Sequence, residues 1–206
     1  MKIVKFFVVA IMLLTFANTA NSQIRFDAQA GWASPQGEAF SDCAKGGLGY
    51  SLDLMYVPSF LDGQLSIGIA KDGNILFGAS KGDETASIDF SASKLGLIGG
   101  KIRFDLKSPV VKPYAAITMG VGRLKVGNMK SASLGGLSLG NDDEFEFDPV
   151  TKFAIKPEIG VAFGHFTIGI GWMLPAEYEV EMIVAKETYK AGVTQFNIGL
   201  SFGGRD

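Results

Sequence analysis

The chain has 206 residues, a formal net charge of −2, one histidine and one cysteine, which excludes a basic nucleic-acid surface, a standard zinc ligand set and an intramolecular disulfide. It contains 27 glycines and has a mean hydropathy of +0.23, yet no stretch after residue 23 is long and apolar enough for a membrane-spanning helix. Helical heptads, internal repeats and low-complexity linkers are absent, which predicts one domain.

The start of the chain has the order of a secretory signal peptide. Two lysines precede an apolar run over residues 6–16, and small and polar residues follow up to Ser22. The run of about 11 apolar residues is shorter than the roughly 20 that a spanning helix needs, so cleavage before Gln23 is favoured over an uncleaved anchor. Residues 1–22 are therefore predicted to be a signal peptide and residues 23–206 the mature domain.

Eight segments alternate apolar side chains with small or polar ones at a period of two, which is typical of strands with one apolar face. The clearest two are separated only by Gly164 and His165, which predicts a long antiparallel hairpin. In the fifth segment the alternation changes phase at Arg123, which indicates a β-bulge or the edge of the apolar band. The predicted strands cover residues 24–32, 48–56, 64–70, 98–106, 114–126, 153–163, 166–174 and 195–202.

Short and long connections alternate between these strands. The second, fourth and sixth connections are short, whereas the others are long, and the third is compatible with strand extensions at residues 74–80 and 84–90. Short turns at one rim and long loops at the other are typical of an outer-membrane barrel with an even number of strands. The sequence therefore predicts an all-β fold, an eight-stranded antiparallel up-and-down transmembrane β-barrel over residues 23–206. Five aromatic residues near strand ends are candidates for interfacial girdles: Trp32, Tyr50, Tyr56, Tyr114 and Trp172.

A secreted or periplasmic lipocalin-like barrel that binds an apolar ligand would show the same alternation with its apolar face inside. Composition favours the membrane barrel, because the non-apolar face is rich in Gly, Ser and Thr, whereas a water-facing wall is rich in Lys and Glu. The charges on this face also balance, as expected of buried ion pairs. We predict that the lumen contains mutual ion pairs among four basic and four acidic residues: Arg25, Asp27, Asp53, Lys101, Arg103, Asp105, Lys156 and Glu158.

Four stretches carry a resemblance to a known group of proteins. They are the end of the signal at residues 20–23, then Lys112–Ala116, Lys156–Gly160 and Phe196–Phe202. They resemble small outer-membrane β-barrel domain proteins of Bacteroidetes-type bacteria, which are similar in architecture to the transmembrane domain of OmpA. The resemblance implies export through a cleaved signal peptide to the outer membrane of a Gram-negative bacterium. Outer-membrane lipid, lipopolysaccharide and the barrel-insertion machinery are the implied partners, although the chain continues past the aromatic residue that should end the insertion signal.

Residues suited to catalysis or metal binding are few. His165 lies in the shortest turn, which this topology places at the periplasmic rim, whereas lipid-A-modifying enzymes of this architecture have catalytic residues that face outside. The acidic run Asp142, Asp143, Glu144, Glu146 and Asp148 has the oxygen ligands of a Ca²⁺ or Mg²⁺ site without the spacing of an EF-hand, so we interpret it as a solvated loop. We expect no catalytic residue, no cofactor and no metal.

Eight strands enclose a space that side chains just fill, so a wide channel is not expected. The sequence thus predicts a non-enzymatic outer-membrane barrel that acts as a structural or surface-interaction module through its long extracellular loops. A lipocalin-like binder and a lipid-A-modifying enzyme are the alternatives. No residue pattern identifies an extracellular or periplasmic partner.

Overall fold

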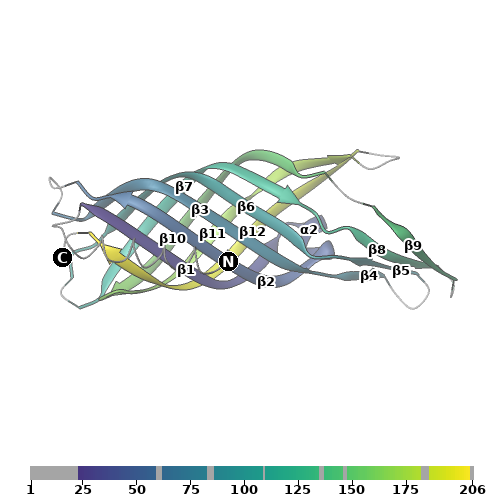
Figure 1. Cartoon of the computed structure of the whole chain (residues 1–206), viewed down its shortest axis with the longest axis horizontal. Helices are drawn as coiled ribbons and strands as arrows, with labels where there is room; N and C mark the ends of the chain where they lie inside the picture. Colours follow the sequence, from purple (N-terminus) through teal and green to yellow (C-terminus); the bar gives the residue numbers. More distant parts are fainter. Residues whose placement is uncertain are drawn as a thin grey trace, which may run out of the picture.

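The computed structural model describes residues 23–58, 62–82, 86–108, 110–134, 137–145, 148–181 and 186–204. Eight of its strands close into an antiparallel barrel in which the last strand pairs with the first, so the predicted eight-stranded up-and-down barrel is confirmed. Figure 1 shows how strongly these strands tilt. In chain order the barrel strands are β1 (Ile24–Gln36), β2 (Ala44–Tyr56), β3 (Leu65–Gly78), β6 (Ser93–Asp105), β7 (Lys112–Lys125), β10 (Val150–Phe163), β11 (Phe166–Glu181) and β12 (Lys186–Gly203).

The two ends of the barrel differ. One end, here called the turn end, holds the start of β1, the end of β12 and the short connections, including the turn at Gly164–His165. Gly164 has φ 55°, a left-handed conformation that glycine adopts without steric cost in a tight hairpin turn. At the other end every barrel strand except β7 runs further than predicted, and β12 begins at residue 186 instead of 195. The apolar alternation fades there, so the strands predicted from sequence periodicity stop short of this end.

A second sheet projects from this other end, here called the sheet end (Figure 1). It has the order β4-β5-β8-β9. The third connection does contain strands, as expected, but the expectation that residues 127–151 form a loop is wrong. Their Ser- and Gly-rich sequence has little strand propensity of its own, and pairing with β5 supplies the backbone hydrogen bonds. The four strands are β4 (Ser80–Gly82), β5 (Ala86–Phe90), β8 (Met129–Leu134) and β9 (Leu137–Phe145).

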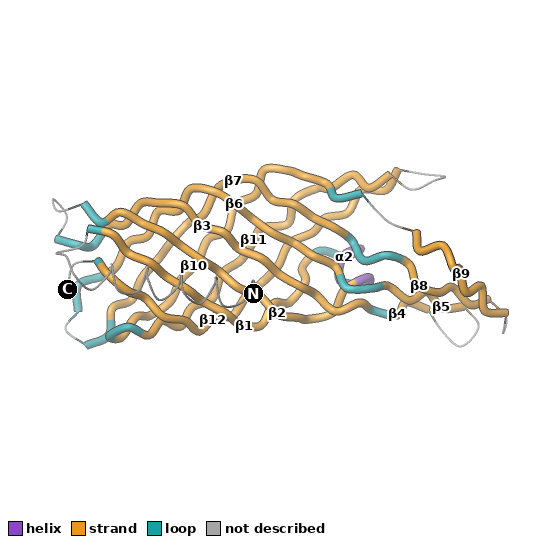
Figure 2. Tube along the Cα trace, in the orientation of Figure 1, coloured by secondary structure: helices purple, strands orange, loops and turns teal. Residues whose placement is uncertain are grey.

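The first long connection contains a short helix, α2 (Glu38–Cys43), at the sheet end (Figure 2). Gly37 precedes it with φ 104°, a backbone conformation that side chains with a Cβ rarely adopt. The helix contacts β1, β2, β4 and β12, and Phe40 on it is completely buried. Within the described residues, no helix is both long and apolar enough to cross a membrane.

The change of phase at Arg123 marks the edge of the apolar band, not a bulge. Arg123 pairs with Gly96 on one side and Thr151 on the other, and the register is continuous through both pairs. Irregularities occur instead between Lys45 and Gly47 and between Met173 and Ala176. Pro175 lies within the second one, as expected for a residue that has no backbone N–H to donate.

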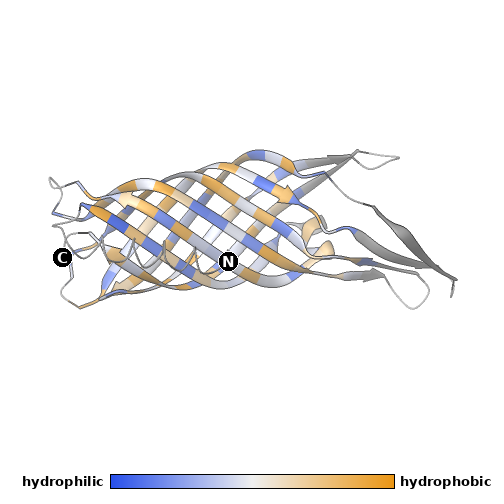
Figure 3. Ribbon diagram, viewed as in Figure 1, coloured by the Kyte–Doolittle hydropathy of each residue, from blue (hydrophilic) through white to orange (hydrophobic). Residues whose placement is uncertain are grey.

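The barrel is apolar outside and polar inside over most of its length. Ile69, Phe153 and Ile198 face outward and are 64%, 65% and 55% exposed, whereas Asp27 and Arg103 face the lumen and are completely buried. Figure 3 shows the resulting alternation of hydrophobic and hydrophilic positions along each strand. This is the opposite of the arrangement in a soluble ligand-binding barrel, which keeps its apolar face inside.

Candidate functional site in the barrel interior

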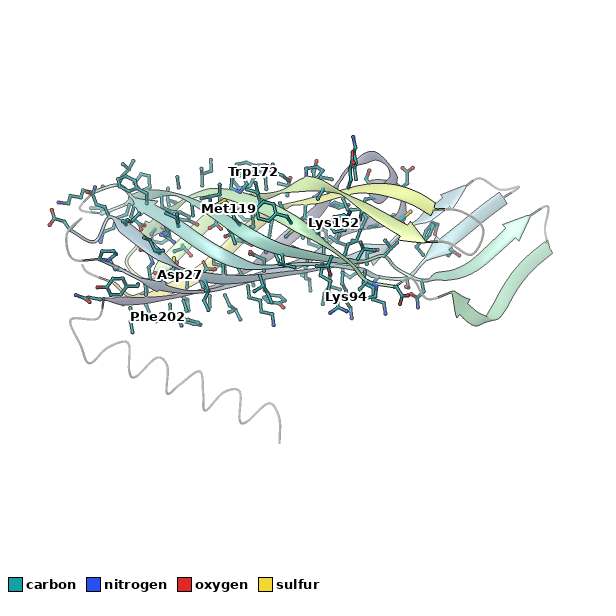
Figure 4. All side chains as sticks on the ribbon, turned by 90° about the horizontal axis from the view of Figure 1, so that it is seen from above. Asp27, Lys94, Met119, Lys152, Trp172 and Phe202 are labelled. Atoms are coloured by element: carbon teal, nitrogen blue, oxygen red, sulfur yellow. The ribbon has the colours of Figure 1, made fainter. Side chains whose placement is uncertain are left out.

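The structure places all eight predicted charged residues in the lumen, where the alternation of β1, β2, β6 and β10 points them. None is more than 9% exposed, and each makes at least one ion pair with another lumenal residue. Figure 4 shows Asp27 toward the turn end and Lys152 toward the sheet end. The ion pairs fall into two groups, and within each group shared side chains link the pairs.

The first group is a closed ring nearest the turn end. Arg25 lies 3.0 Å from Asp27 and 2.8 Å from Asp105, and Arg103 lies 2.9 Å from Asp27 and 2.7 Å from Asp105. Each aspartate therefore accepts from both guanidinium groups, and the ring joins β1 to β6 across the interior. The Arg103 guanidinium also stacks 3.6 Å from the ring centroid of Tyr114.

The second group centres on two lysines and Glu158. Lys101 Nζ lies 2.6 Å from Asp53 and 3.1 Å from Glu158, and Lys156 Nζ lies 2.5 Å from Asp72. Lys156 and Glu158 themselves are 4.0 Å apart, at the limit of an ion pair. Tyr114 donates its hydroxyl to Glu158 at 2.8 Å, so this carboxylate is held from several strands.

Sequence reasoning missed two members of this network. Asp72 follows the predicted end of its strand, but it continues the inward parity of Ser66 and Ala70, and that signal was sufficient to find it. Tyr114 was a candidate for an interfacial girdle, and this is wrong, because the residue is 4% exposed and its side chain lies between Arg103 and Glu158. With Asp72 the described network has five carboxylates for four cations, so the predicted equality of charges is also wrong.

Apolar side chains fill the lumen beyond the ion pairs, toward the sheet end. The inward parity that carries Lys101 and Arg103 on β6 carries Leu97 and Leu95 nearer the sheet end. Phe40 of α2 packs into this group, so the helix closes the barrel mouth from inside. We call this group the apolar cluster; its members include Phe40, Cys43, Leu76, Leu95, Leu97, Leu124, Val126, Met173, Tyr178 and Val193.

The remaining candidates for a functional site are His165 and the acidic run. His165 Nδ1 lies 3.0 Å from the carbonyl oxygen of Ser201, and its ring stacks on Phe202. In the part of the chain that the structure describes, no three His, Cys, Asp or Glu side chains are grouped as metal ligands. The acidic run does not form a simple loop, because β9 includes its first three residues; Glu146 and the side chains of β9 lie outside the described residues.

These features define a closed eight-stranded antiparallel barrel with a charged, filled interior and an apolar outer wall. Solved outer-membrane barrels share the fold. The crystal structure of Neisserial surface protein A (NspA) superposes with a TM-score of 0.52 at 14% identity, over 88% of this chain and 97% of that one.

Two further barrels superpose less closely. The N-terminal barrel domain of Pseudomonas aeruginosa OprF gives a TM-score of 0.39 at 10% identity, over 88% and 98% of the two chains. The Yersinia pestis outer membrane protein Ail, in a phospholipid bilayer nanodisc, gives 0.39 at 14% identity, over 86% and 99%. No protein-family model and no curated protein matches the chain. The likeness to NspA therefore shows the fold alone.

Proposed function

We propose that this chain is exported through a cleaved signal peptide and inserts into the outer membrane of a Gram-negative bacterium. The observation that carries the proposal is the outer wall, where large apolar side chains are exposed around the barrel while the charged side chains are buried inside. An apolar surface of this extent is stable only when lipid or another apolar partner covers it. The architecture agrees with the resemblance to small Bacteroidetes-type barrels and to the OmpA transmembrane domain.

Within the membrane, the barrel acts as a non-conducting, non-catalytic scaffold. The ion-pair network and the apolar cluster occupy successive levels of the lumen. At the sheet end, β4, β5, β8 and β9 extend beyond the barrel wall (Figure 1). With the turn end in the periplasm, as in up-and-down outer-membrane barrels, this sheet is presented at the cell surface as an interaction module.

Fractionation tests the membrane location. We expect the protein to remain with outer membranes until detergent is added, and the folded form to migrate differently from the boiled form on SDS gels, because a closed hydrogen-bonded barrel resists SDS at room temperature. Mass spectrometry of the extracted protein should give an N-terminus at Gln23. Recovery of the mature chain as a soluble periplasmic protein would contradict the proposal.

Planar bilayers test the closed lumen. We expect the purified barrel to show no large, stable conductance, because charged side chains bridge the interior and apolar side chains close it nearer the sheet end. A general porin inserted under the same conditions is the positive control. Steady wide-pore currents from heat-modifiable protein would show that the lumen is open.

A further inference from the structure

A groove of about 770 Å³ lies on the outer wall of the barrel across β3, β6 and β7. Its floor is a row of directly paired positions, in which Gly73 lies opposite Gly96 and Gly96 lies opposite Arg123. Tyr50 pairs with Gly73 at one side, and Thr151 pairs with Arg123 at the other. The Tyr50 ring lies over Gly73, whereas the space above Gly96 is open, so Gly96 leaves a shallow trough between an aromatic wall and a basic wall.

The charged residues on the outer face of β3, β6 and β7 have one sign. The outward positions of β3, β6 and β7 carry four basic residues, and the acidic residues of these strands, Asp72 and Asp105, both point into the lumen. By contrast, the outward positions of β1 carry no charged residue. Four outward-facing basic residues thus line one groove: Lys71, Lys94, Arg123 and Lys125.

Three of these side chains have no counterion among the residues that the structure describes. Among the described residues, no acidic side chain lies within ion-pair distance of Lys71, Lys94 or Arg123. Lys71 also lies between the outward-facing Ile69 and Ile75 on β3, within the apolar wall. A lysine on a lipid-facing wall is costly unless its ammonium reaches an anion at the membrane interface. The structure therefore presents an unmatched positive charge where lipid is expected.

We infer that this groove is a binding site for lipid A, the acylated and phosphorylated disaccharide of the outer leaflet. The inference rests on the proposed insertion into the outer membrane. Arg123 and Lys94 lie toward the sheet end, which faces outward in that orientation, and Figure 4 shows Lys94 on this side of the barrel. The basic residues are spread over three strands. They therefore match lipid A, which carries two separated phosphates, better than a glycerophospholipid, which carries one phosphate.

The groove supplies both kinds of contact that such a lipid needs. Arg123 and Lys94 donate charge-assisted hydrogen bonds to phosphate oxygens, and Arg123 can do so with two N–H groups at once. Ile98 and Val121, 60% and 55% exposed, continue the groove toward the turn end and cover the upper part of an acyl chain. At Gly96 the absence of a side chain lets this acyl chain approach the barrel backbone closely.

Native mass spectrometry of the full-length mature barrel, released from detergent micelles, tests the site with bisphosphorylated lipid A as the probe. We expect wild-type protein to retain one lipid A, and the double variant Lys94→Ala/Arg123→Ala to bind it at least about tenfold more weakly, because two charge-assisted contacts are lost. Lys190→Ala is the control, since this exposed lysine lies on β12 and pairs with Glu177. Each variant is first checked for heat-modifiable migration, which reports a folded barrel.

Gly96→Leu tests the shape of the groove independently of its basic residues. A Cβ at Gly96 meets only the Asp72 carbonyl oxygen at 3.4 Å, an ordinary contact, so the barrel accommodates the substitution while the leucine side chain fills the trough. We expect this variant to lose lipid A although every basic residue remains. Dephosphorylated lipid A and phosphatidylglycerol should both be retained more weakly by the wild type.

Equal retention of lipid A by wild type and both variants would overturn the site, as would equal retention of phosphatidylglycerol, which would show a general preference for anionic lipid. No retention by a folded, heat-modifiable wild-type barrel would also overturn it, while leaving the proposed membrane location intact. Failure of the mature chain to enter membranes or micelles would instead contradict the proposed function itself.

Discussion

Replacing Arg103 by alanine is expected to lower the free energy of unfolding by about 3–5 kcal/mol, more than any other single truncation in the lumenal network. Arg103 is completely buried and joins Asp27 to Asp105 from the opposite side of the ring to Arg25. Without it, both aspartates depend on Arg25 alone, and one of two closely spaced buried carboxylates is left uncompensated. The measurement is urea unfolding of the refolded barrel in detergent micelles, followed by intrinsic fluorescence.

The same network predicts that losing an acid costs less than losing a base, because five carboxylates share four cations. In Glu158→Ala, Lys101 keeps Asp53 at 2.6 Å and Lys156 keeps Asp72 at 2.5 Å, so no lysine is left unpaired. The remaining cost is the loss of the hydrogen bonds that Tyr114, Lys101 and Gln29 donate to Glu158, together with the cavity that the side chain leaves. We therefore expect Glu158→Ala to destabilise the barrel less than Arg103→Ala.

Two variants calibrate this comparison. Arg103→Lys keeps the charge but not the planar fork that bonds two aspartates, so it should fall between wild type and Arg103→Ala. Glu177→Ala removes one member of the exposed Lys190 pair and should cost less than about 1 kcal/mol. If Arg103→Ala were as mild as Glu177→Ala, water would reach the ring and its charges would be solvated.

Local alternation predicted the barrel well. The hairpin around Gly164 pairs Phe163 with Phe166 as expected, and the parity of each strand assigned the eight lumenal charges to one face before any pairing was known. Parity does not give partners, which depend on the register and on which strands face each other. The ring between β1 and β6 joins residues 76 to 80 positions apart, and no local pattern encodes such a contact.

The interior near the sheet end was not predicted, for a physical reason. The period-two pattern led us to expect polar residues at every inward-facing position. Beyond the apolar outer band, however, the lumen is lined by Leu95, Leu97 and Leu124. The phase change at Arg123 was the visible sign of this reversal, since Arg123 points out and Leu124 points in. The helix α2 left no periodic signal, because six residues make fewer than two turns.

Truncation of Phe40 should expose the apolar cluster. Phe40→Ala removes a completely buried ring that α2 contributes to the apolar cluster, and comparable core truncations cost about 3–5 kcal/mol. Cys43, the only cysteine of the chain, lies at the end of the same helix and is 5% exposed, so it reports on this region directly. We expect maleimide labelling of Cys43 in the folded barrel to accelerate at least about tenfold in the variant, since each 1.4 kcal/mol taken from the opening free energy is a tenfold change in the open population.

Phe40→Leu tests whether packing is the cause. Leucine retains part of the apolar volume, so its labelling rate should lie between those of wild type and Phe40→Ala, while the loss of unfolding free energy follows the same order. Heat-modifiable migration should persist in both variants, because the closed ladder of eight strands does not depend on α2. Unchanged labelling in Phe40→Ala would mean that the helix does not close the lumen, and the sheet end would then be sealed by the strand side chains of the apolar cluster alone.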